Sequence, residues 1–128
     1  MAWVAGVPLA QLEPATGQPI AVAGTFLLAA LFYAVTAHLA ARYVLGSVSV
    51  VPAIGVGIVL AAVAFLLRSF GPAPVIAVSL TTDLVAIKRF YDLDWRPTAL
   101  VTVAHYALSA ILGITLFNLA RLLATAPG

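Results

Sequence analysis

Residues 48–67 read VSVVPAIGVGIVLAAVAFLL and contain no charged side chain. A helix needs about 20 consecutive apolar residues to cross a hydrocarbon core of about 30 Å, because each residue adds about 1.5 Å along its axis. This stretch has that length. We therefore predict that residues 48–67 form a transmembrane helix.

Three further apolar runs flank this stretch and complete a predicted set of four spans. The runs cover residues 20–45, 72–91 and 98–123, of which 72–91 is the least apolar. Prolines stand at or near the start of each, where a missing N–H costs little: Pro19, Pro72, Pro74 and Pro97. Because the connections are short, neighbouring spans are expected to be antiparallel. The predicted fold is an all-α integral membrane bundle of four transmembrane helices, running up-down-up-down.

The composition supports a membrane location. Hydrophobic residues make up 64% of the chain, charged residues 8%, and the mean hydropathy is +1.17. An ordinary soluble domain is about half apolar and about a quarter charged. Too little polar surface remains to cover a water-soluble core, so we expect a multi-pass protein of the cytoplasmic membrane.

The chain is expected to form one domain after a short lead-in. Residues 1–18 mix polar and apolar side chains, lack a basic start, and contain Pro8, so they do not resemble a signal peptide and are expected to be retained. Residues 19–128 are predicted to form a single four-helix transmembrane domain.

The basic residues predict the orientation in the membrane. With four spans, one side would carry Arg42, Lys88, Arg89 and Arg96, and the other Arg68 and Arg121. Positive charge favours the cytoplasmic side. This four-to-two bias predicts that the first and third loops are cytoplasmic and that both termini are extracytoplasmic.

The sequence lacks several common motifs of soluble enzymes. It contains no cysteine, which excludes disulfides and thiolate metal sites, and no phosphate loop, HExxH or GxSxG motif. The few basic residues that raise the pI to about 9.4 are explained by membrane-flanking positions, so no nucleic-acid partner is implied. We expect a protein without catalytic residues that is not an enzyme.

Small residues at helical spacing predict close helix contacts. Such residues allow two backbones to approach and gain dispersion contacts that lipid cannot replace. The predicted packing positions are Gly55, Gly57, Ala61, Ser109 and Gly113. Their partner is either another helix of the same chain or a second subunit. Large apolar residues on the other faces, Leu60 among them, are expected to face lipid.

Ionisable residues inside the spans form the best functional clue. His38, Asp83 and His105 fall roughly 7–11 Å inside the same predicted membrane surface. Arg42 lies one helical turn from His38, and Thr36 and several other hydroxyls lie at neighbouring levels. A charged Asp at a helix centre costs about 2.5–3.5 kcal/mol, so Asp83 needs a partner or must be neutral. The partner could be Arg42, His38 or His105.

This predicted intramembrane cluster of His38, Arg42, Asp83 and His105 has several possible uses. It could fix the register of the helices, or handle a proton or small ion, since histidine and a desolvated aspartate both exchange protons near neutral pH. Alternatively, His38 and His105 could ligate a b-type haem across the bundle. The favoured expectation includes no metal and no cofactor.

One exposed loop combines charge with aromatic side chains. Its main residues are Lys88, Arg89, Trp95 and Arg96. The loop could bind a soluble partner or anionic lipid headgroups. The simplest interpretation is a helix-terminal anchor and turn.

Three segments of the spans stand out as a set: FYAVTAHLAARYVLG at residues 32–46, PVIAVSLTTDLVAIK at 74–88 and VTVAHYALSAILGITLFNL at 101–119. Together they resemble a family of small multi-span membrane proteins from halophilic archaea whose function is uncharacterised. The resemblance covers about residues 24–123. It implies a location in a cytoplasmic membrane but no activity, and it assigns no functional residue.

The sequence therefore favours an accessory or structural subunit of a membrane assembly. Its partners would be the lipid bilayer and either other membrane subunits or further copies of the chain. A proton or small-ion transport component that uses Asp83 and the histidines is the first alternative. A haem-bearing electron-transfer anchor is the second.

Overall fold

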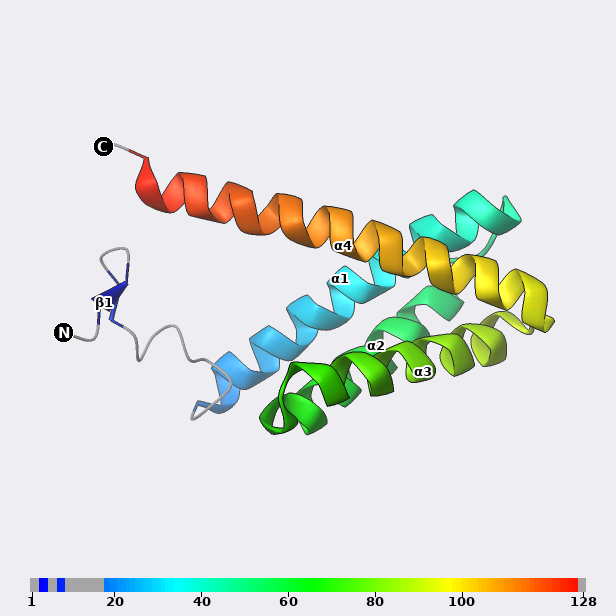
Figure 1. Ribbon diagram of the computed structural model, residues 1–128, viewed down its shortest axis with the longest axis horizontal. Helices are drawn as coiled ribbons and strands as arrows, with labels where there is room; N and C mark the ends of the chain where they lie inside the picture. The colour runs from blue at the N-terminus through cyan, green and yellow to red at the C-terminus, as the bar shows by residue number, and fades with distance from the viewer. Residues whose placement is uncertain (1–2, 5–6, 9–17, 127–128) are drawn as a thin grey trace.

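Four α-helices make up nearly all of the described structure (Figure 1). The computed structural model describes residues 3–4, 7–8 and 18–126. The helices are α1 (Pro19–Leu45), α2 (Val51–Leu67), α3 (Pro72–Tyr91) and α4 (Trp95–Thr125), and a short 3-10 turn, η3 (Arg68–Phe70), follows α2. The all-α, four-helix prediction is confirmed.

Three of the helical segments are long and apolar enough to cross a membrane. They are Pro19–Leu45, Val51–Phe70 and Trp95–Thr125. The helix α3 is long enough, with 20 residues, but it is less apolar than these three segments, so a fourth span remains a prediction.

Most of the predicted lead-in lies outside the described residues. Within it, β1 (Trp3–Val4) and β2 (Val7–Pro8) pair as antiparallel strands. The structure therefore leaves the interpretation of residues 1–18 as a lead-in untested.

Two helices begin at other residues than predicted, and each has a proline in its first turn. The helix α2 begins at Val51 rather than at residue 48, with Pro52 in its first turn, and the Ser49 hydroxyl accepts a bond from the Val51 N–H at 3.2 Å. The helix α4 begins at Trp95 rather than at residue 98, so Pro97 lies inside its first turn. Proline is tolerated there because first-turn N–H groups have no partner within the helix.

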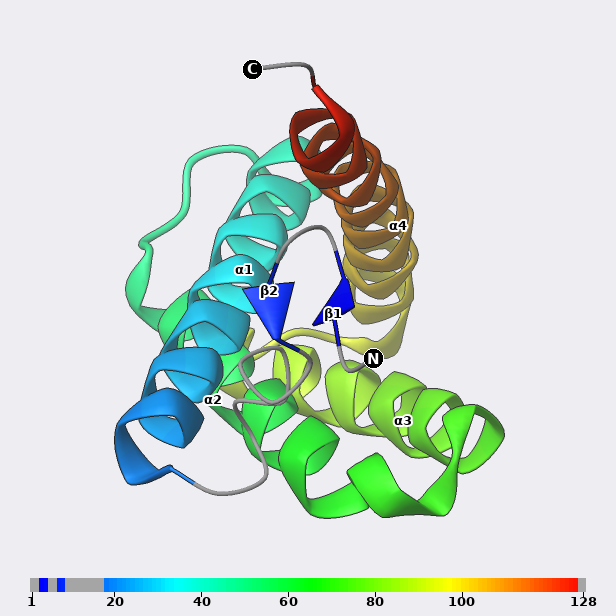
Figure 2. The same cartoon turned by 90° about the vertical axis from the view of Figure 1, so that its left-hand side faces the viewer.

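The helices form a ring in which sequence neighbours are antiparallel. Each of α1, α2 and α3 contacts the next helix, and α4 also returns to α1. Figure 2 shows this ring from one end, and Figure 1 shows that α1 starts and α4 finishes at that same end. A left-handed residue, Asp92, ends α3 and makes the tight turn into α4.

Burial is concentrated at the opposite end of the ring. We call this the packed end: the last turns of α1 and α3 and the first turns of α2 and α4. Its buried apolar side chains include Ala37, Ala40, Ala41, Ala53, Val56, Ala86, Ile87 and Val101. Most are alanine or valine, so the backbones approach closely.

The other end, which we call the open end, is formed by the first turns of α1 and α3 and by the second half of α4. No residue of α4 beyond His105 is buried in the described chain, and residues 114–126 are all exposed. Figure 1 shows α4 diverging from α1 toward the termini. In a bilayer these exposed apolar side chains would lie in lipid.

Two glycines allow α1 and α3 to approach α2 closely. A Cβ added at Gly57 would overlap the Ala30 carbonyl oxygen and lie 2.8 Å from the Ala34 backbone nitrogen. A Cβ at Gly55 would meet the Phe90 ring at 2.6–2.9 Å, whereas one at Gly113 would come no closer than 3.9 Å to another residue. The contacts of Gly55 and Gly57 therefore lie within one chain.

Leu60 departs from its expected environment. Its side chain is only 4% exposed, so it faces the interior of the bundle and not lipid. Three residues before it, Gly57 faces α1, and i,i+3 residues share one face of a helix. The expectation failed because the composition of α2 is apolar on every face and gives no signal for its rotation.

Candidate functional site

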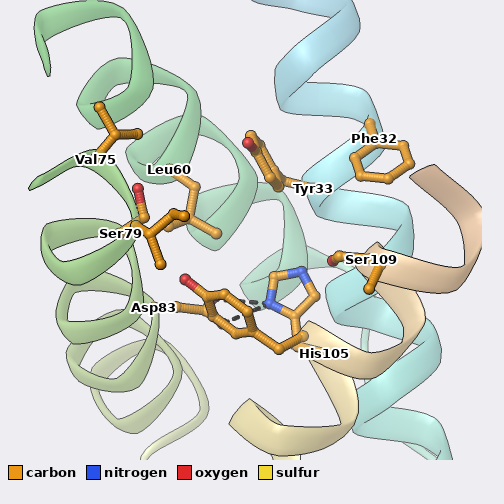
Figure 3. Close-up of a pocket in the computed structure, with 11 residues that line it drawn as sticks. Phe32, Tyr33, Leu60, Val75, Ser79, Asp83, His105 and Ser109 are labelled. Atoms are coloured by element: carbon orange, nitrogen blue, oxygen red, sulfur yellow. Dashed lines mark hydrogen bonds and ion pairs between the residues drawn. The ribbon is translucent and has the colours of Figure 1, made fainter. Parts of the chain in front are cut away.

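A buried carboxylate–imidazole pair connects α3 to α4. The His105 Nδ1 atom lies 2.7 Å from Asp83 Oδ2 and 2.9 Å from Oδ1 (Figure 3). Asp83 is fully buried and His105 is 2% exposed. With Asp83 ionised, the Nδ1–H group donates to the carboxylate, which is the charge-assisted and stronger kind of hydrogen bond.

Thr36 on α1 is the third member of this site. Its Oγ1 lies 2.8 Å from His105 Nε2, 2.9 Å from the Phe32 carbonyl oxygen and 3.1 Å from that of Tyr33. The hydroxyl has one hydrogen to donate and can also accept. Thr36 therefore links the imidazole to the α1 backbone, and the site spans three helices.

The hydroxyl of Thr36 can serve either protonation state of His105. When Nε2 carries no proton, the hydroxyl donates to it. When Nε2 is protonated, Nε2–H donates to Oγ1, and the hydroxyl turns to donate to the Phe32 or Tyr33 carbonyl. A proton can thus be added or removed with only a rotation of the hydroxyl hydrogen.

Each of these three residues faces inward because it belongs to a row of buried residues along one face of its helix. On α4 the buried positions are Thr98, Val101, Thr102 and His105, which follow the i, i+3, i+4, i+7 spacing of one helix face. On α3 they are Asp83, Ala86 and Ile87, and on α1 Thr36 adjoins Ala37, Ala40 and Ala41. Each polar member continues the stripe that packs the core.

His38 and Arg42 lie outside this site, although they belong to the predicted cluster. Asp83 pairs with His105, whereas Arg42 is exposed and is not among its partners. The Nδ1 atom of His38 is buried without a hydrogen-bond partner. His38 follows Thr36 by two positions, and i,i+2 residues do not face the same way on a helix. His38 and Arg42 thus have a predicted depth similar to that of the Asp83–His105 pair, but the rotation of α1 about its axis turns them away from it.

Thr36 could have been found from the sequence. It follows Phe32 and Tyr33 and directly precedes the small residue Ala37, and it lies at the level of the predicted cluster. Its hydroxyl is one of several at that depth. The missing information was that small residues at Ala37, Ala40 and Ala41 mark the inward face of α1.

A pocket of about 340 Å³ lies over the Asp83–His105 pair on the side of the open end (Figure 3). Its other lining residues lie on the open-end side of the pair. They precede Thr36 on α1, precede Asp83 on α3 and follow His105 on α4. The polar lining residues besides the pair are Tyr33, Ser79, Tyr106 and Ser109. The pair therefore forms the floor of a pocket whose walls belong to all four helices.

The order of Thr36, His105 and Asp83 matches a nucleophile–base–acid triad, but the surroundings do not suit nucleophilic catalysis. Thr36 is completely buried and already lies against the imidazole and its own helix backbone. A nucleophile must reach the substrate carbonyl, with donors placed for the developing oxyanion. The arrangement suits proton exchange better than acyl transfer.

The residues do not fit a bis-histidine haem in this arrangement. Both nitrogens of His105 have protein partners, at 2.7 Å and 2.8 Å, so iron would have to displace Thr36 or Asp83. His38 lies outside the site. Among the described residues, no group of three or more His, Cys, Asp or Glu side chains is placed to hold a metal ion.

The charged loop forms a compact turn. The Lys88 ammonium donates to the Leu93 carbonyl at 3.0 Å and lies 4.9 Å from the centre of the Trp95 ring. Arg89 and Arg96 are exposed. Lys88 and Trp95 thus stabilise the connection between α3 and α4, and Arg89 and Arg96 remain available to headgroups or a partner.

Comparison with known proteins identifies a family but no activity. A model of a family of unknown function, DUF7473, matches residues 16–127, so the chain belongs to that family. No curated protein matches the chain, and no solved structure does.

Proposed function

We propose that this member of DUF7473 is a non-enzymatic protein of the cytoplasmic membrane that binds and releases a proton at the site formed by Asp83, His105 and Thr36. The observation that carries the proposal is the buried Asp83–His105 pair at the floor of a pocket within the bundle. The resemblance to membrane proteins of halophilic archaea is consistent with this location and stays a prediction.

The electrostatics of the pair favour proton binding. With His105 neutral and Asp83 ionised, the site carries one negative charge in a mostly apolar interior. One added proton makes the pair neutral, whether it rests on the imidazole or on the carboxylate. Burial penalises the uncompensated charge, while the pocket offers a route by which water can remove the proton.

The difference between the two ends of the bundle supports proton exchange with one side of the membrane. The packed end contains fully buried side chains from all four helices, including Ala37, Val56, Ile87 and Val101. The pocket lies on the other side of the pair. We therefore propose that the proton exchanges with the aqueous phase at the open end, which the basic residues predict to be extracytoplasmic.

We include α3 as a fourth span in this proposal. Its 20 residues give a length of about 30 Å, which matches a hydrocarbon core. Asp83 is buried against α4, and the Thr81 hydroxyl donates to the Ala77 carbonyl of its own helix at 3.0 Å. The polar groups that lower its hydropathy are thus partly removed from lipid.

Nitrogen-15 NMR of labelled histidine in lipid nanodiscs tests the proposal directly. The chain has two histidines, so a His38→Gln variant assigns the signals of His105. We expect the ring nitrogens of His105 to change reversibly between neutral and protonated shifts as pH falls, and Asp83→Asn to displace that transition. A single protonation state over the whole pH range in which the protein stays folded would refute the proposal.

Proteoliposomes distinguish one-sided exchange from transport. One-sided exchange predicts that a pH gradient decays no faster than in empty liposomes. Faster decay that Asp83→Asn abolishes would instead support a proton-transporting form of the same site.

A role as an accessory subunit is the second candidate. The observation that favours it is the exposed last part of α4, residues 114–125, which extends beyond the helices it packs against (Figure 1). Crosslinking in native membranes should then recover a stoichiometric partner through this segment. A monomer in several mild detergents and in crosslinked membranes would count against it.

A further inference from the structure

We infer that the pocket over Asp83 and His105 binds a small organic cation, a quaternary or protonated amine, and that this cation replaces the proton of the site. The inference rests on the proposed function, because it needs Asp83 and His105 to share an exchangeable proton. It names the chemical class of ligand that the pocket would bind.

The charges that face the pocket favour a cation. The titratable lining residues are Tyr33 from α1, Asp83 from α3, and His105 and Tyr106 from α4, while α2 contributes Leu60. No lysine or arginine lines the pocket. Among the described residues, Asp83 is therefore the one acidic group of the pocket, and only His105 can offset its charge. An organic anion would meet the carboxylate with no further positive partner.

The remaining walls suit an organic cation better than a hydrated metal ion. Phe32, Tyr33 and Tyr106 are aromatic, and aromatic faces attract cations from about 6 Å. Ser79 and Ser109 add hydroxyl oxygens that can accept from an ammonium group. The volume of about 340 Å³ also falls in the range of small-molecule sites, about 300–1,000 Å³.

Charge neutrality couples the cation to the proton. The protonated pair is neutral, so adding a cation to it would leave a net positive charge in the interior. If the proton leaves, the cation and the ionised Asp83 again sum to zero. The balanced exchange is one cation entering from the open end and one proton released to the same side.

Choline and its neutral isostere 3,3-dimethyl-1-butanol are suitable probes, because they differ mainly in the charge of the head. Binding to the full chain in nanodiscs would be followed by calorimetry, and proton release by an indicator dye in weakly buffered solution. We expect choline to bind in a saturable manner with release of about one proton, and its affinity to rise up to about tenfold for each pH unit while the free site holds its proton. The neutral isostere should release none.

Variants locate the binding to this pocket. Asp83→Asn should abolish both proton release and pH dependence, and Tyr106→Leu should weaken choline binding by roughly 2- to 30-fold through loss of an aromatic face. The matched control is Phe117→Leu, an exposed aromatic of α4 outside the pocket, which should leave binding unchanged. The comparison of the two probes needs no variant, so it holds even if Asp83→Asn fails to fold.

Three results would overturn the inference: no choline binding, choline binding without proton release, or equal affinity for the neutral isostere. If His105 still titrates by NMR in those cases, the proposed proton site survives and only the ligand class is wrong. A His105 that does not titrate would remove both.

Discussion

The packed end and the open end of this bundle are built from the same four helices but from different side chains. At the packed end, alanine, glycine and valine bring the backbones together, and the fully buried residues gather there. At the open end, leucine, isoleucine and phenylalanine are exposed along α1 and α4. Close packing in a membrane depends on small residues, because large apolar side chains are equally well solvated by lipid.

The Asp83–His105–Thr36 site lies at the boundary between these two ends. The packed end below it holds α1, α3 and α4 at fixed distances, so the three polar groups meet within 2.7–2.9 Å. In the proposed function, the pocket above it provides access for a proton. On that proposal, a site deeper in the packed end would lack this route, and one nearer the open end would lack the positioning of neighbouring helices.

The largest expected effect comes from two glycine substitutions, one where α2 packs closely against the middle of α1 and one near the open start of α1. Gly57→Leu should destabilise the fold by about 3 kcal/mol or more, because even its Cβ would overlap the α1 backbone. Gly24→Leu should be nearly neutral, since no other part of the described chain lies within 4 Å of an added Cβ at Gly24. Thermal unfolding in mild detergent measures both. Equal losses would contradict the difference between close helix packing and the open start of α1.

The second-largest loss of stability is expected from changes to the Asp83–His105 pair. Asp83→Leu should cost about 1–3 kcal/mol, because it leaves a buried imidazole nitrogen without its partner. A double-mutant cycle with His105→Leu should reveal a coupling of about 1 kcal/mol or more, whereas the cycle with Arg42→Leu should be additive within about 0.5 kcal/mol. Denaturant unfolding in detergent gives the free energies. Coupling to Arg42 instead of His105 would contradict the observed rotation of α1.

A smaller effect is expected from Thr36. Thr36→Val removes a hydroxyl bonded to His105 and should cost about 0.6 kcal/mol, the average for hydrogen bonds between membrane helices, and at most about 1.7 kcal/mol. It should also shift the nitrogen-15 signal of His105 Nε2. Within the described chain, the Thr25 hydroxyl at the open end donates only to the Ala21 carbonyl of its own helix, so Thr25→Val is the control. An unchanged His105 spectrum in Thr36→Val would exclude the link.

The smallest effect is expected along the exposed part of α4. Ile114 is 62% exposed, so Ile114→Ala should change the unfolding free energy by no more than about 0.5 kcal/mol. Val101 is fully buried at the packed end of the same helix, and Val101→Ala should cost about 1 kcal/mol or more. A large loss from Ile114→Ala in the native membrane, absent in detergent, would indicate a partner on this segment.

The sequence by itself determined the membrane character, the four helices and the approximate level of the polar residues. Helix length and apolar composition follow directly from the order of residues, and prolines mark the starts to within one turn. The level of Asp83 and His105 follows because depth is proportional to position along a helix. None of these properties requires knowledge of which helices touch.

Only the tertiary structure decided which polar residues meet. Rotation about each helix axis placed Thr36 beside His105 and turned Arg42 outward, and it buried Leu60 against the pocket. In a soluble helix the polar face reveals this rotation, but in a membrane both the lipid and the core are apolar, so the hydrophobic pattern does not separate them. The contact of small residues between helices carries the missing information, and it exists only once the helices are packed.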